Sequence, residues 1–360
     1  MLSQNVLVIG GTGNIGQCIA KDIVQCTDAK VTVTGRNSSY KGNFPFLPLN
    51  LTQKETITDL IADYDLVVHS AGPFHDRDGR VLKSCIEAGV NYVDVSDHRS
   101  FHFQVTPYHE QAQASGITAI LHTGVFPGIS NLMAKQGVES LDRAQSLFLY
   151  YLVGGSGGAG LTVMRTTFLG LKSPFSAWID GKWQQVSPYS DRETVTFPNY
   201  GKGGVYWFDV AETYTLADTF PVETVVTKFG SIPDFYNHLT WLTAHQFPKS
   251  MLENPISLEF LSKVSFAMAR LTDTWSGVGI AVCVEVKGEK DGKAENLSLQ
   301  LYHDHTAIAA GRGAGSIAQL LLNQEIDQPG VWSVEQAVPI SLFQKTMEQR
   351  GITINLQQRG

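Results

Sequence analysis

Residues Val6–Ile23 read VLVIGGTGNIGQCIAKDI, an apolar run followed by spaced glycines and a helix-like segment. The glycines fall as Gly11-x-Gly13-x-x-Gly16. In this spacing the first glycine permits a tight turn, the second lets a backbone approach a pyrophosphate, and the third lets the helix pack closely. The stretch therefore predicts a strand, a turn and a helix whose N-terminus binds a dinucleotide. The alternative is a glycine-rich turn that holds no ligand.

The residues roughly 20 positions beyond the glycines read the adenosine end of such a cofactor. An acidic residue there would accept the ribose 2′-hydroxyl of NAD, but this chain has Thr34-Gly35-Arg36-Asn37. A guanidinium suits a 2′-phosphate through charge-assisted hydrogen bonds. Arg36 therefore favours NADP, with NAD as the less favoured cofactor. The alternative is that Arg36 is a solvated loop residue.

Short β-branched runs alternate with helix-like segments through the first part of the chain. The segments at 81–88 and 103–114 carry apolar residues at helical spacing, and several strands are nearly all apolar, as strands covered on both faces must be. The pattern predicts an α/β domain over residues 1–135, with a Rossmann-type doubly wound parallel sheet. The expected strands are Val6–Ile9, Val31–Thr34, Phe46–Leu49, Leu66–His69, Tyr92–Val95 and Thr118–Leu121.

Longer β-rich stretches with turn signals follow, and they predict a second α+β domain over residues 136–325, built on a largely antiparallel sheet. Asp291-Gly292 is typical of a hairpin turn. Residues 326–360, helical from Val334 to Arg350, are expected to return to the first domain. The expected strands are Thr194–Phe197, Val222–Phe229, Val278–Lys287 and Leu297–His303, and the expected helices are Thr162–Leu171, Phe235–Gln246, Leu258–Arg270 and Thr306–Leu322.

Composition limits the function. The chain has 360 residues, of which 43% are apolar and 17% charged, and a net charge of −7. These values are typical of a globular protein, and the lack of clustered Lys and Arg argues against a nucleic-acid partner. The 4 cysteines lack metal-ligand spacing, and no apolar run is long enough to span a membrane. The N-terminus leaves no room for a secretion signal, so we expect a cytoplasmic protein without an integral membrane segment.

A family resemblance is carried by several motifs together. They are GGTGNIG at 10–16, AGPF at 71–74, AGVNYVDVSD at 88–97, GVFPGISNLMA at 124–134, GGSGGAGLTVMRTT at 154–167, DGKWQQVSP at 180–188 and PGVWSVEQAV at 329–338. The chain resembles the saccharopine dehydrogenase-like NAD(P)-binding oxidoreductases, in particular their bacterial branch. The resemblance implies a Rossmann domain, a mixed second domain, and hydride transfer between NADP(H) and a small organic substrate of the carbonyl, imine or enoyl class.

Cofactor residues are expected in three loops at the carboxyl ends of strands. Beside the glycine loop and the Arg36 loop, HSAGPF at 69–74 ends the fourth expected strand and should face the glycine loop across the switch point of the sheet. A plain Gly-Pro turn is the alternative. The expected cofactor-binding residues are Gly10, Gly11, Thr12, Gly13, Asn14, Ile15, Gly16, Gly35, Arg36, Asn37, Ala71, Gly72, Pro73 and Phe74.

Catalytic candidates follow the fifth expected strand. His98 can exchange a proton near neutral pH and Asp97 can orient it, although Asp97 could instead cap the next helix, with His98 in solvent. The glycines of residues 154–160 could bind a substrate carboxylate or phosphate, with Arg165 as support, or form a hinge or a tight chain crossing. The expected substrate residues, in a pocket between the two domains, are Phe126, Gly128, Asn131, Gly157 and Gly158.

Several alternatives stay open. Adjacent His303, Asp304 and His305 would point to opposite faces of a strand, so we expect no metal site. A non-catalytic NADP-binding regulator or scaffold is a second function, and a lipid or isoprenoid reductase is a third, suggested by the apolar helix around residues 260–271. The expected partners are a small-molecule substrate and a second copy of the chain, bound through the second domain as a homodimer.

Overall fold

The computed structural model describes residues 3–36, 39–51 and 57–358, and the chain divides into two compact units. The first comprises Met1–Ile129 and Ala307–Arg350, and the second comprises Ser130–Thr306 and Gly351–Gly360. This division differs from the expected limits at residues 135 and 325. The helix at 306–322 lies almost wholly in the first unit, and the last strand belongs to the second.

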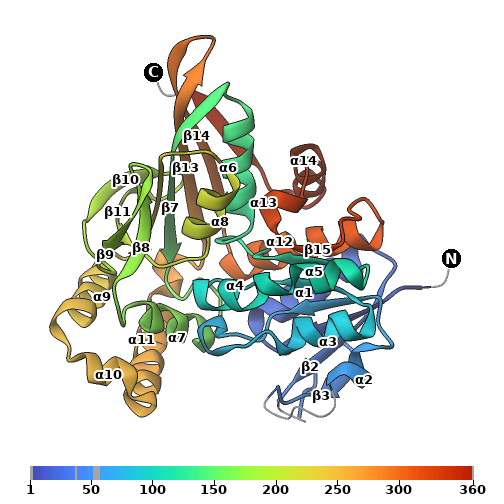
Figure 1. The fold of residues 1–360 in the computed structure, drawn as a ribbon. Coiled ribbons are helices and arrows are strands. Elements are labelled where there is room, and N and C mark those ends of the chain that lie inside the picture. Colours follow the sequence, from blue (N-terminus) through green and yellow to red (C-terminus); the bar gives the residue numbers. More distant parts are fainter. Residues whose placement is uncertain (1–2, 37–38, 52–56, 359–360) are drawn as a thin grey trace. The chain divides into compact units, whose positions relative to one another are not determined.

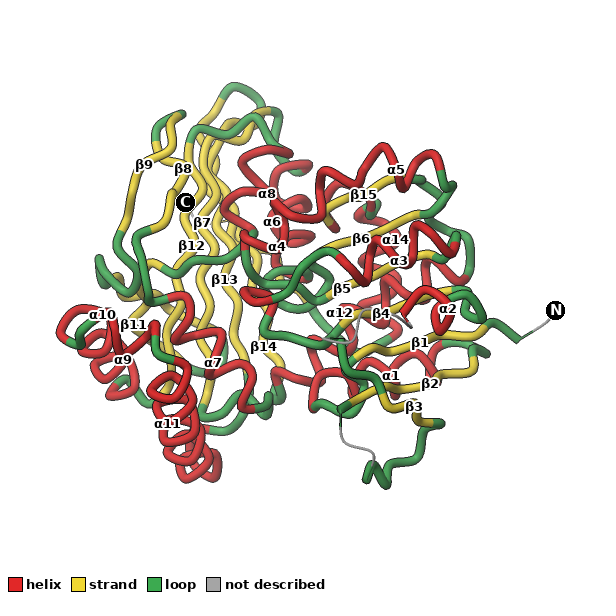
Figure 2. Tube along the Cα trace, turned by 60° about the horizontal axis from the view of Figure 1, so that its bottom comes forward, coloured by secondary structure: helices red, strands yellow, loops and turns green. Residues whose placement is uncertain are grey.

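The first unit is built on a parallel sheet in the order β15-β6-β5-β4-β1-β2-β3, which Figure 2 shows strand by strand. Strand order reverses between β4 and β1, so the doubly wound fold is confirmed. β15 was not expected, because it lies far along the chain from the other strands. The strands are β1 (Asn5–Ile9), β2 (Lys30–Gly35), β3 (Phe46–Pro48), β4 (Leu66–His69), β5 (Asn91–Asp94), β6 (Thr118–Leu121) and β15 (Gly330–Ser333).

Apolar helix faces cover this sheet. The helices α2 (Ile57–Ile61), α3 (Arg80–Ala88), α4 (Arg99–Val105) and α5 (His109–Ala114) contribute buried residues to one core with strand residues such as Leu7, Val67 and Tyr92. The expected continuous helix over 103–114 is interrupted by a 3-10 turn, Thr106–Tyr108, which has Pro107 in its first turn and lies between α4 and α5. α1 (Asn14–Cys26) contacts β1 and β2 and packs against α12 (Thr306–Leu322), where Gly311 approaches Cys18.

A buried ion pair joins α1 to the end of the first unit. The guanidinium of Arg350 donates from Nη2 to Oδ2 of Asp22 at 2.8 Å, and both side chains are almost fully buried. Arg350 Nη1 also donates to Gln319 of α12 at 2.8 Å. Arg350 follows α14 (Ile340–Gln349), which is separate from α13 (Val334–Ala337) because Pro339, the N-cap of α14, is extended. This charge pair fixes the C-terminal segment to the first unit up to Arg350, whereas Gly351–Gly360, which we also expected to return there, belong to the second unit.

The second unit is built on a mixed sheet in the order β10-β11-β12-β7-β13-β14-β16, with β8 paired to β12 and β9 paired to β8. Figure 1 shows β7, β13 and β14 side by side in this sheet. Most pairs are antiparallel, but β7 and β12 run parallel. Asp291 and Gly292, with φ of 51° and 71°, form the expected hairpin turn. The strands are β7 (Arg143–Gly154), β8 (Phe175–Ile179), β9 (Lys182–Val186), β10 (Glu193–Phe197), β11 (Gly201–Trp207), β12 (Thr224–Ile232), β13 (Ile280–Lys290), β14 (Lys293–His303) and β16 (Ile354–Gln358).

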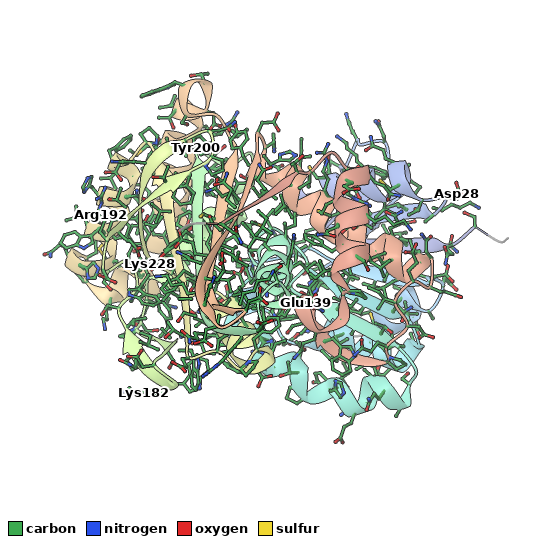
Figure 3. All side chains as sticks on the ribbon, turned by 90° about the horizontal axis from the view of Figure 1, so that it is seen from above. Asp28, Glu139, Lys182, Arg192, Tyr200 and Lys228 are labelled. Atoms are coloured by element: carbon green, nitrogen blue, oxygen red, sulfur yellow. The ribbon has the colours of Figure 1, made fainter. Side chains whose placement is uncertain are left out.

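Helices and buried charges complete the second unit. Lys228 of β12, labelled in Figure 3, is buried. Its Nζ donates to Asp191 at 2.8 Å and to Glu193 at 3.2 Å. The charge is therefore compensated inside the sheet region. The helices are α6 (Ile129–Glu139), α7 (Leu161–Gly170), α8 (Glu212–Thr219), α9 (Phe235–Gln246), α10 (Lys249–Glu253) and α11 (Pro255–Ser276).

The buried pair predicts a large loss of stability when one partner is removed. Arg350→Ala leaves the Asp22 carboxylate buried without its counter-ion, so the free energy of unfolding should fall by about 3–5 kcal/mol. Urea denaturation measures this change. Lys345→Ala is the control, because Lys345 is 58% exposed and its pair with Glu325 is 3.6 Å long. It should change stability by less than about 1 kcal/mol. Equal effects of the two variants would contradict the assignment.

Candidate functional site

The glycine loop between β1 and α1 is held in place by close backbone contacts. Gly10 has a φ of +80°, and a Cβ at this position would lie 2.8 Å from the Cα of Ala71. A Cβ at Gly11 would lie 2.6 Å from the Cβ of Val33. Side chains at these two positions would therefore push the loop away from β2 and from the loop that follows β4. The structure brings the glycine loop and the Ala71 loop together, as the topology led us to expect.

Gly13 differs from its neighbours, because the space beside it is open. A Cβ there would meet only the carbonyl oxygen of Gly10, at 3.3 Å. Gly13 is the N-cap of α1 and makes no side-chain cap, so the first-turn N–H groups point out of the helix end. These N–H groups and the helix dipole suit an anion. Since the protein itself does not crowd Gly13, its lack of a side chain fits the close approach of a pyrophosphate.

Two cations lie at the expected adenosine end. Arg36 is exposed just after β2, where Gly35 packs against the side chain of Thr12. Burial, and next the positive charge of Arg36, lower the pKa of Arg77 below its ordinary value. Arg36 and Arg77 are therefore close enough to repel each other, and a bound dianion would relieve that repulsion. Asn37, the next expected cofactor residue, lies outside the described residues.

Arg77 was not among the expected residues, and it also shapes the loop after β4. Its Nε donates to the carbonyl oxygen of Ala71 at 2.7 Å. Ser70 donates from Oγ to the carbonyl oxygen of Ile9 at 2.9 Å, which joins this loop to β1. Phe74 is placed differently from its neighbours, because it is buried and packs on His69 and Phe101 at ring distances of 5.0 Å. Phe74 therefore supports the loop from the core.

The carboxylate of Asp94, at the end of β5, organises the next two loops. Oδ1 accepts hydrogen bonds from Ser96 N at 3.0 Å, from Ser96 Oγ at 2.6 Å and from His122 N at 2.9 Å. Oδ2 accepts from the hydroxyl of Tyr92 at 3.1 Å. The Asp94 carbonyl oxygen accepts from Thr123 N and Oγ1. One buried residue therefore holds the loop after β5 to the loop after β6.

Hydrogen bonding continues from Asp94 in both directions through imidazoles. Nδ1 of His122 lies 2.9 Å from the carbonyl oxygen of Ser96, which can only accept, so Nδ1 carries the proton. Nε2 of a neutral His122 then accepts from Nδ1 of His102 at 3.1 Å. On the other side, the Tyr92 hydroxyl donates to Asp94 and accepts from Nδ1 of His69 at 3.0 Å. The result is a continuous chain from His102 to His69.

Burial keeps His69 and His122 neutral at ordinary pH. It lowers the pKa of His69 to about 3 and the pKa of His122 to about 4. Burial also raises the pKa of Asp94 to about 6, although hydrogen bonds from Ser96 and His122 act in the opposite direction. At neutral pH the network therefore holds the ionised carboxylate of Asp94 between two uncharged rings, His69 and His122.

The expected catalytic pair lies in the loop that Asp94 holds. Our alternative interpretation placed Asp97 at the helix cap and His98 in solvent, and both parts of it were wrong. His98 is 5% exposed and is itself the N-cap of α4, with its side chain accepting from Ser100 N at 3.2 Å. Burial lowers the pKa of His98 to about 4, against the nearby negative charge of Asp97. Asp97 is half-buried beside a neutral ring.

The expected substrate residues at 126–131 fall into the two units. Gly128 has a φ of +135° and closes onto Gly124, so this loop of the first unit tolerates no side chain there. Phe126 precedes it in the same loop. Asn131 belongs to the second unit, where it is buried and donates to Thr215 Oγ1 at 3.2 Å. The first-unit loop remains a candidate for contact with substrate, and Asn131 has a role within its own unit.

In the glycine segment 154–160, a carboxylate of the same unit, that of Asp273, already accepts hydrogen bonds from the loop. Ser156 donates from N and from Oγ to the carboxylate of Asp273, at 2.7 and 2.8 Å. Gly155 N donates to the carbonyl oxygen of Ile232, and a side chain at Gly158 would overlap the ring of His305. These contacts fit the tight chain crossing that we considered. A substrate role for Gly157 and Gly158 stays a prediction.

Arg165, which we expected to assist this loop, is already in an ion pair. Arg165 pairs with Glu259 through two hydrogen bonds, at 2.7 and 2.8 Å. Near the end of β14, His303 Nδ1 accepts from His305 N at 3.0 Å. Within the ranges that the structure describes, no group of three or more His, Cys, Asp and Glu side chains is arranged to hold a metal ion. The same ranges contain no helix long and apolar enough to cross a membrane.

Comparison with known proteins agrees with this geometry. Residues 6–120 match the model of the saccharopine dehydrogenase NADP binding domain. Carboxynorspermidine synthase of Vibrio cholerae serotype O1 is 24% identical over 387 residues, covering 97% of this chain and 91% of that protein. Carboxyaminopropylagmatine dehydrogenase of Synechocystis is 22% identical over 329 residues, covering 83% of this chain and 82% of that protein.

Solved structures share the fold over nearly the whole chain. Apo saccharopine dehydrogenase (L-Glu forming) from Saccharomyces cerevisiae superimposes with a TM-score of 0.71 at 14% identity, covering 99% of this chain and 100% of that chain. DAP dehydrogenase of C. glutamicum gives a TM-score of 0.52 at 14% identity, covering 95% and 96% of the two chains. The matched NADP-binding domain includes the glycine loop, Arg36 and Arg77, so the cofactor of this chain is NADP.

The two cations predict a cofactor preference that a titration can measure. Arg36→Ala removes a charge-assisted contact to the 2′-phosphate, so NADPH binding should weaken by about 1.5–3 kcal/mol, or roughly 10- to 100-fold. NADH binding should barely change, because NADH lacks that phosphate. Fluorescence titration with both cofactors gives the two constants. Arg143→Ala, on a side chain that is 64% exposed in the second unit, is the control and should change neither. Equal losses for NADPH and NADH would contradict this role of Arg36.

Acid should destabilise the protein between about pH 6.5 and pH 4. In the unfolded chain, His69, His98 and His122 bind protons near their ordinary pKa of 6.5, whereas the native rings do so only near 3 to 4. Unfolding therefore takes up protons in this window, and the free energy of unfolding falls as the pH falls. Asp94 acts with the opposite sign, because its native pKa is raised to about 6. Because three imidazoles outweigh one carboxyl group, the free energy of unfolding still falls as the pH falls.

His122→Gln tests this assignment. The lowered pKa of His122 accounts for about 3 kcal/mol of the decrease in the free energy of unfolding between pH 7 and pH 4, so the variant should lack this part of the decrease. Urea midpoints measured across this range give the slope. His238→Gln is the matched control, because the His238 side chain is 70% exposed, and its slope should follow the unmodified protein. A slope in His122→Gln equal to that of the unmodified protein would rule out a buried neutral His122.

Proposed function

The chain is an NADP-binding oxidoreductase with a saccharopine dehydrogenase-type cofactor domain, and we propose that it is a reductase that acts on the C=N bond of a cationic imine. The imine would form between an aliphatic primary amine and a carbonyl compound. The names of the two related enzymes, carboxynorspermidine synthase and carboxyaminopropylagmatine dehydrogenase, describe amines that carry a carboxyl group. We extend that substrate class to this chain.

One observation carries the proposal: the loops at the carboxyl ends of β5 and β6 combine carboxylates with neutral imidazoles. A protonated imine is cationic, and a carboxylate stabilises it while an imidazolium would repel it. His98 and His122, with pKa values lowered to about 4, carry no charge at neutral pH. Asp97 stands beside His98, half-buried. The region thus favours a positively charged substrate.

In the proposed reaction, each residue has a defined task. Bound NADPH would provide the hydride for the imine carbon, and the nitrogen would keep its proton and become a secondary amine. Per turnover, an amine, a carbonyl compound, NADPH and a proton give a secondary amine, NADP and water. Asp97 would stabilise the cationic nitrogen until the hydride neutralises it. Asp94, through Ser96 and His122, would hold the two loops rigid around the reacting atoms.

A substrate panel tests the proposal. The chain is incubated with NADPH and one of four additions: a carboxyl-bearing aldehyde, a diamine, both together, or an enoyl acceptor alone. The loss of NADPH absorbance is followed. Oxidation only when both are present supports imine reduction. Oxidation with the aldehyde alone would identify a carbonyl reductase, and oxidation with an enoyl acceptor alone would identify the lipid alternative. Tight NADPH binding without turnover on any acceptor would instead support the regulator or scaffold.

The role of Asp97 has its own variant. Asp97→Asn removes the negative charge at nearly the same size, so kcat/KM should fall by about 100-fold or more, in line with loss of one positioned charged group. NADPH affinity should stay the same, because Asp97 is assigned to the substrate. Glu110→Gln, on the exposed surface of α5, is the control. A normal kcat/KM in Asp97→Asn would remove Asp97 from the mechanism.

A further inference from the structure

The helix α11 presents a continuous apolar stripe on its outer face. Asn254 is the N-cap of this helix, and its side chain accepts a hydrogen bond from Ile256 N at 2.9 Å. Its inner face is fixed by buried Ser262 and Ala269. The outer face repeats apolar residues every three or four positions, so they lie in one row along the helix. This outer stripe consists of Ile256, Phe260, Val264, Ala267, Leu271 and Trp275.

The members of the outer stripe are unusually exposed for their size. Ile256 is 80% exposed, Leu271 is 76% exposed and Trp275 is 73% exposed. At 1.5 Å of rise per residue, the row extends for about 29 Å. Apolar residues scattered singly on a surface need no explanation, but a contiguous patch marks an interaction site. The stripe therefore calls for a partner.

The neighbouring helix α9 widens this surface. The Tyr236 hydroxyl of α9 donates to the carbonyl oxygen of Met268 in α11 at 2.8 Å, so the two helices lie side by side. Figure 2 shows α9, α10 and α11 together at one end of the second sheet. α9 adds exposed Phe235, Leu239 and Leu242, each 42% exposed. Together the two helices offer a broad apolar face.

The outer stripe has an internal symmetry. Its members pair off at equal distances from the point between Ser265 and Phe266: Ile256 with Trp275, Phe260 with Leu271, and Val264 with Ala267. If a second α11 lies antiparallel across a two-fold axis at that point, each residue meets its pair on the other copy. An isologous interface needs this self-complementarity, whereas a different partner does not.

Residue size along the stripe fits the same arrangement. Two helices that cross are closest at the crossing point and diverge toward their ends. The smallest members, Val264 and Ala267, lie at the centre of the stripe, and the bulky Phe260, Leu271 and Trp275 lie toward its ends. The central residues allow close approach, and the outer ones fill the widening gap.

The charges around this face favour a protein partner over an anionic lipid surface. A membrane-bound amphipathic helix is flanked mainly by Lys and Arg. Here exposed cations such as Lys263 and Arg270 are accompanied by exposed Asp234 and Glu253. Lys263 is already paired with Glu259, at 3.2 Å. A rim with both signs of charge is typical of contacts between proteins.

We propose that the outer stripe of α11 is a homodimer interface, formed by antiparallel packing against α11 of a second copy. Only residues of the second unit are involved, so the dimer is independent of the reaction proposed above. The contact is one helical face wide, so we expect reversible association with a dissociation constant on the order of 1–10 μM.

Sedimentation across a range of protein concentrations tests the assembly. The unmodified chain should pass from monomer to dimer as its concentration rises through the micromolar range. Phe260→Glu and Leu271→Glu should each weaken the dimer at least 100-fold, because both place a charge in the interface. Val24→Glu, at a residue of α1 that is 49% exposed, is the control and should dimerise normally. Circular dichroism confirms that each variant is folded.

Disulfide trapping tests the register. A tagged Val264→Cys chain mixed with an untagged Ala267→Cys chain should form a mixed disulfide under mild oxidation, because these positions meet across the two-fold axis. Val264→Cys mixed with Leu271→Cys is one helical turn out of register and should form at least tenfold less. Both mixtures carry the same native cysteines, so their background is shared. Equal trapping in both mixtures would overturn the antiparallel register.

Two outcomes would overturn the proposal as a whole. The first is a monomer at all concentrations that binds vesicles of phosphatidylcholine and phosphatidylserine, with binding lost in Leu271→Glu, which would assign the stripe to a membrane surface. The second is a dimer that persists unchanged in both charged variants, which would place the interface elsewhere. A monomer that binds no vesicles would likewise contradict the homodimer.

Discussion

The carboxylate of Asp94 is the constraint on which the candidate site depends. It accepts hydrogen bonds from Tyr92 and twice from Ser96, which lie in β5 and in the loop after it, and from His122, which lies in the loop after β6. A buried carboxylate needs such donors, because an unsatisfied charge in the interior is costly. The loops after β5 and β6 therefore cannot move independently of each other. The groups that they carry, including Asp97 and His98, are positioned by a single buried charge.

The order of the elements could be predicted because the period of apolar residues reports it directly. The strands of the parallel sheet and the helices at 235–246 and 306–322 agree with that pattern. β7 was missed, because its central residues are buried on both faces and show no alternation. β15 was missed because pairing between residues 118–121 and 330–333 leaves no local signal. Prolines that divide the expected helices were visible in the sequence, but their effect was underestimated.

The cofactor end of the site could be predicted, since each glycine has a local backbone reason that the sequence displays. The chemistry beyond it could not. Asp94 lies within a motif that we quoted, yet nothing in the sequence shows that its oxygens meet His122. Arg77 was missed for the same reason, because its proximity to Arg36 comes from the folding of two separate loops. His98 was expected in solvent as one alternative, and only tertiary packing shows that it is buried.

The first unit is discontinuous, and this has a consequence for the order of folding during synthesis. Most of the second unit, Ser130–Thr306, is translated before α12, β15 and α14 exist, so at that stage the nascent first unit lacks an edge strand and a helical layer. Asp22 lacks its counter-ion, Arg350, until the chain has grown by a further 328 residues. Domains generally fold as they leave the ribosome, N-terminal ones first. Here the first unit can be completed only after residues 130–306 of the second unit have been synthesised, and until then the apolar surface that α12 and β15 cover in the finished unit stays exposed to solvent.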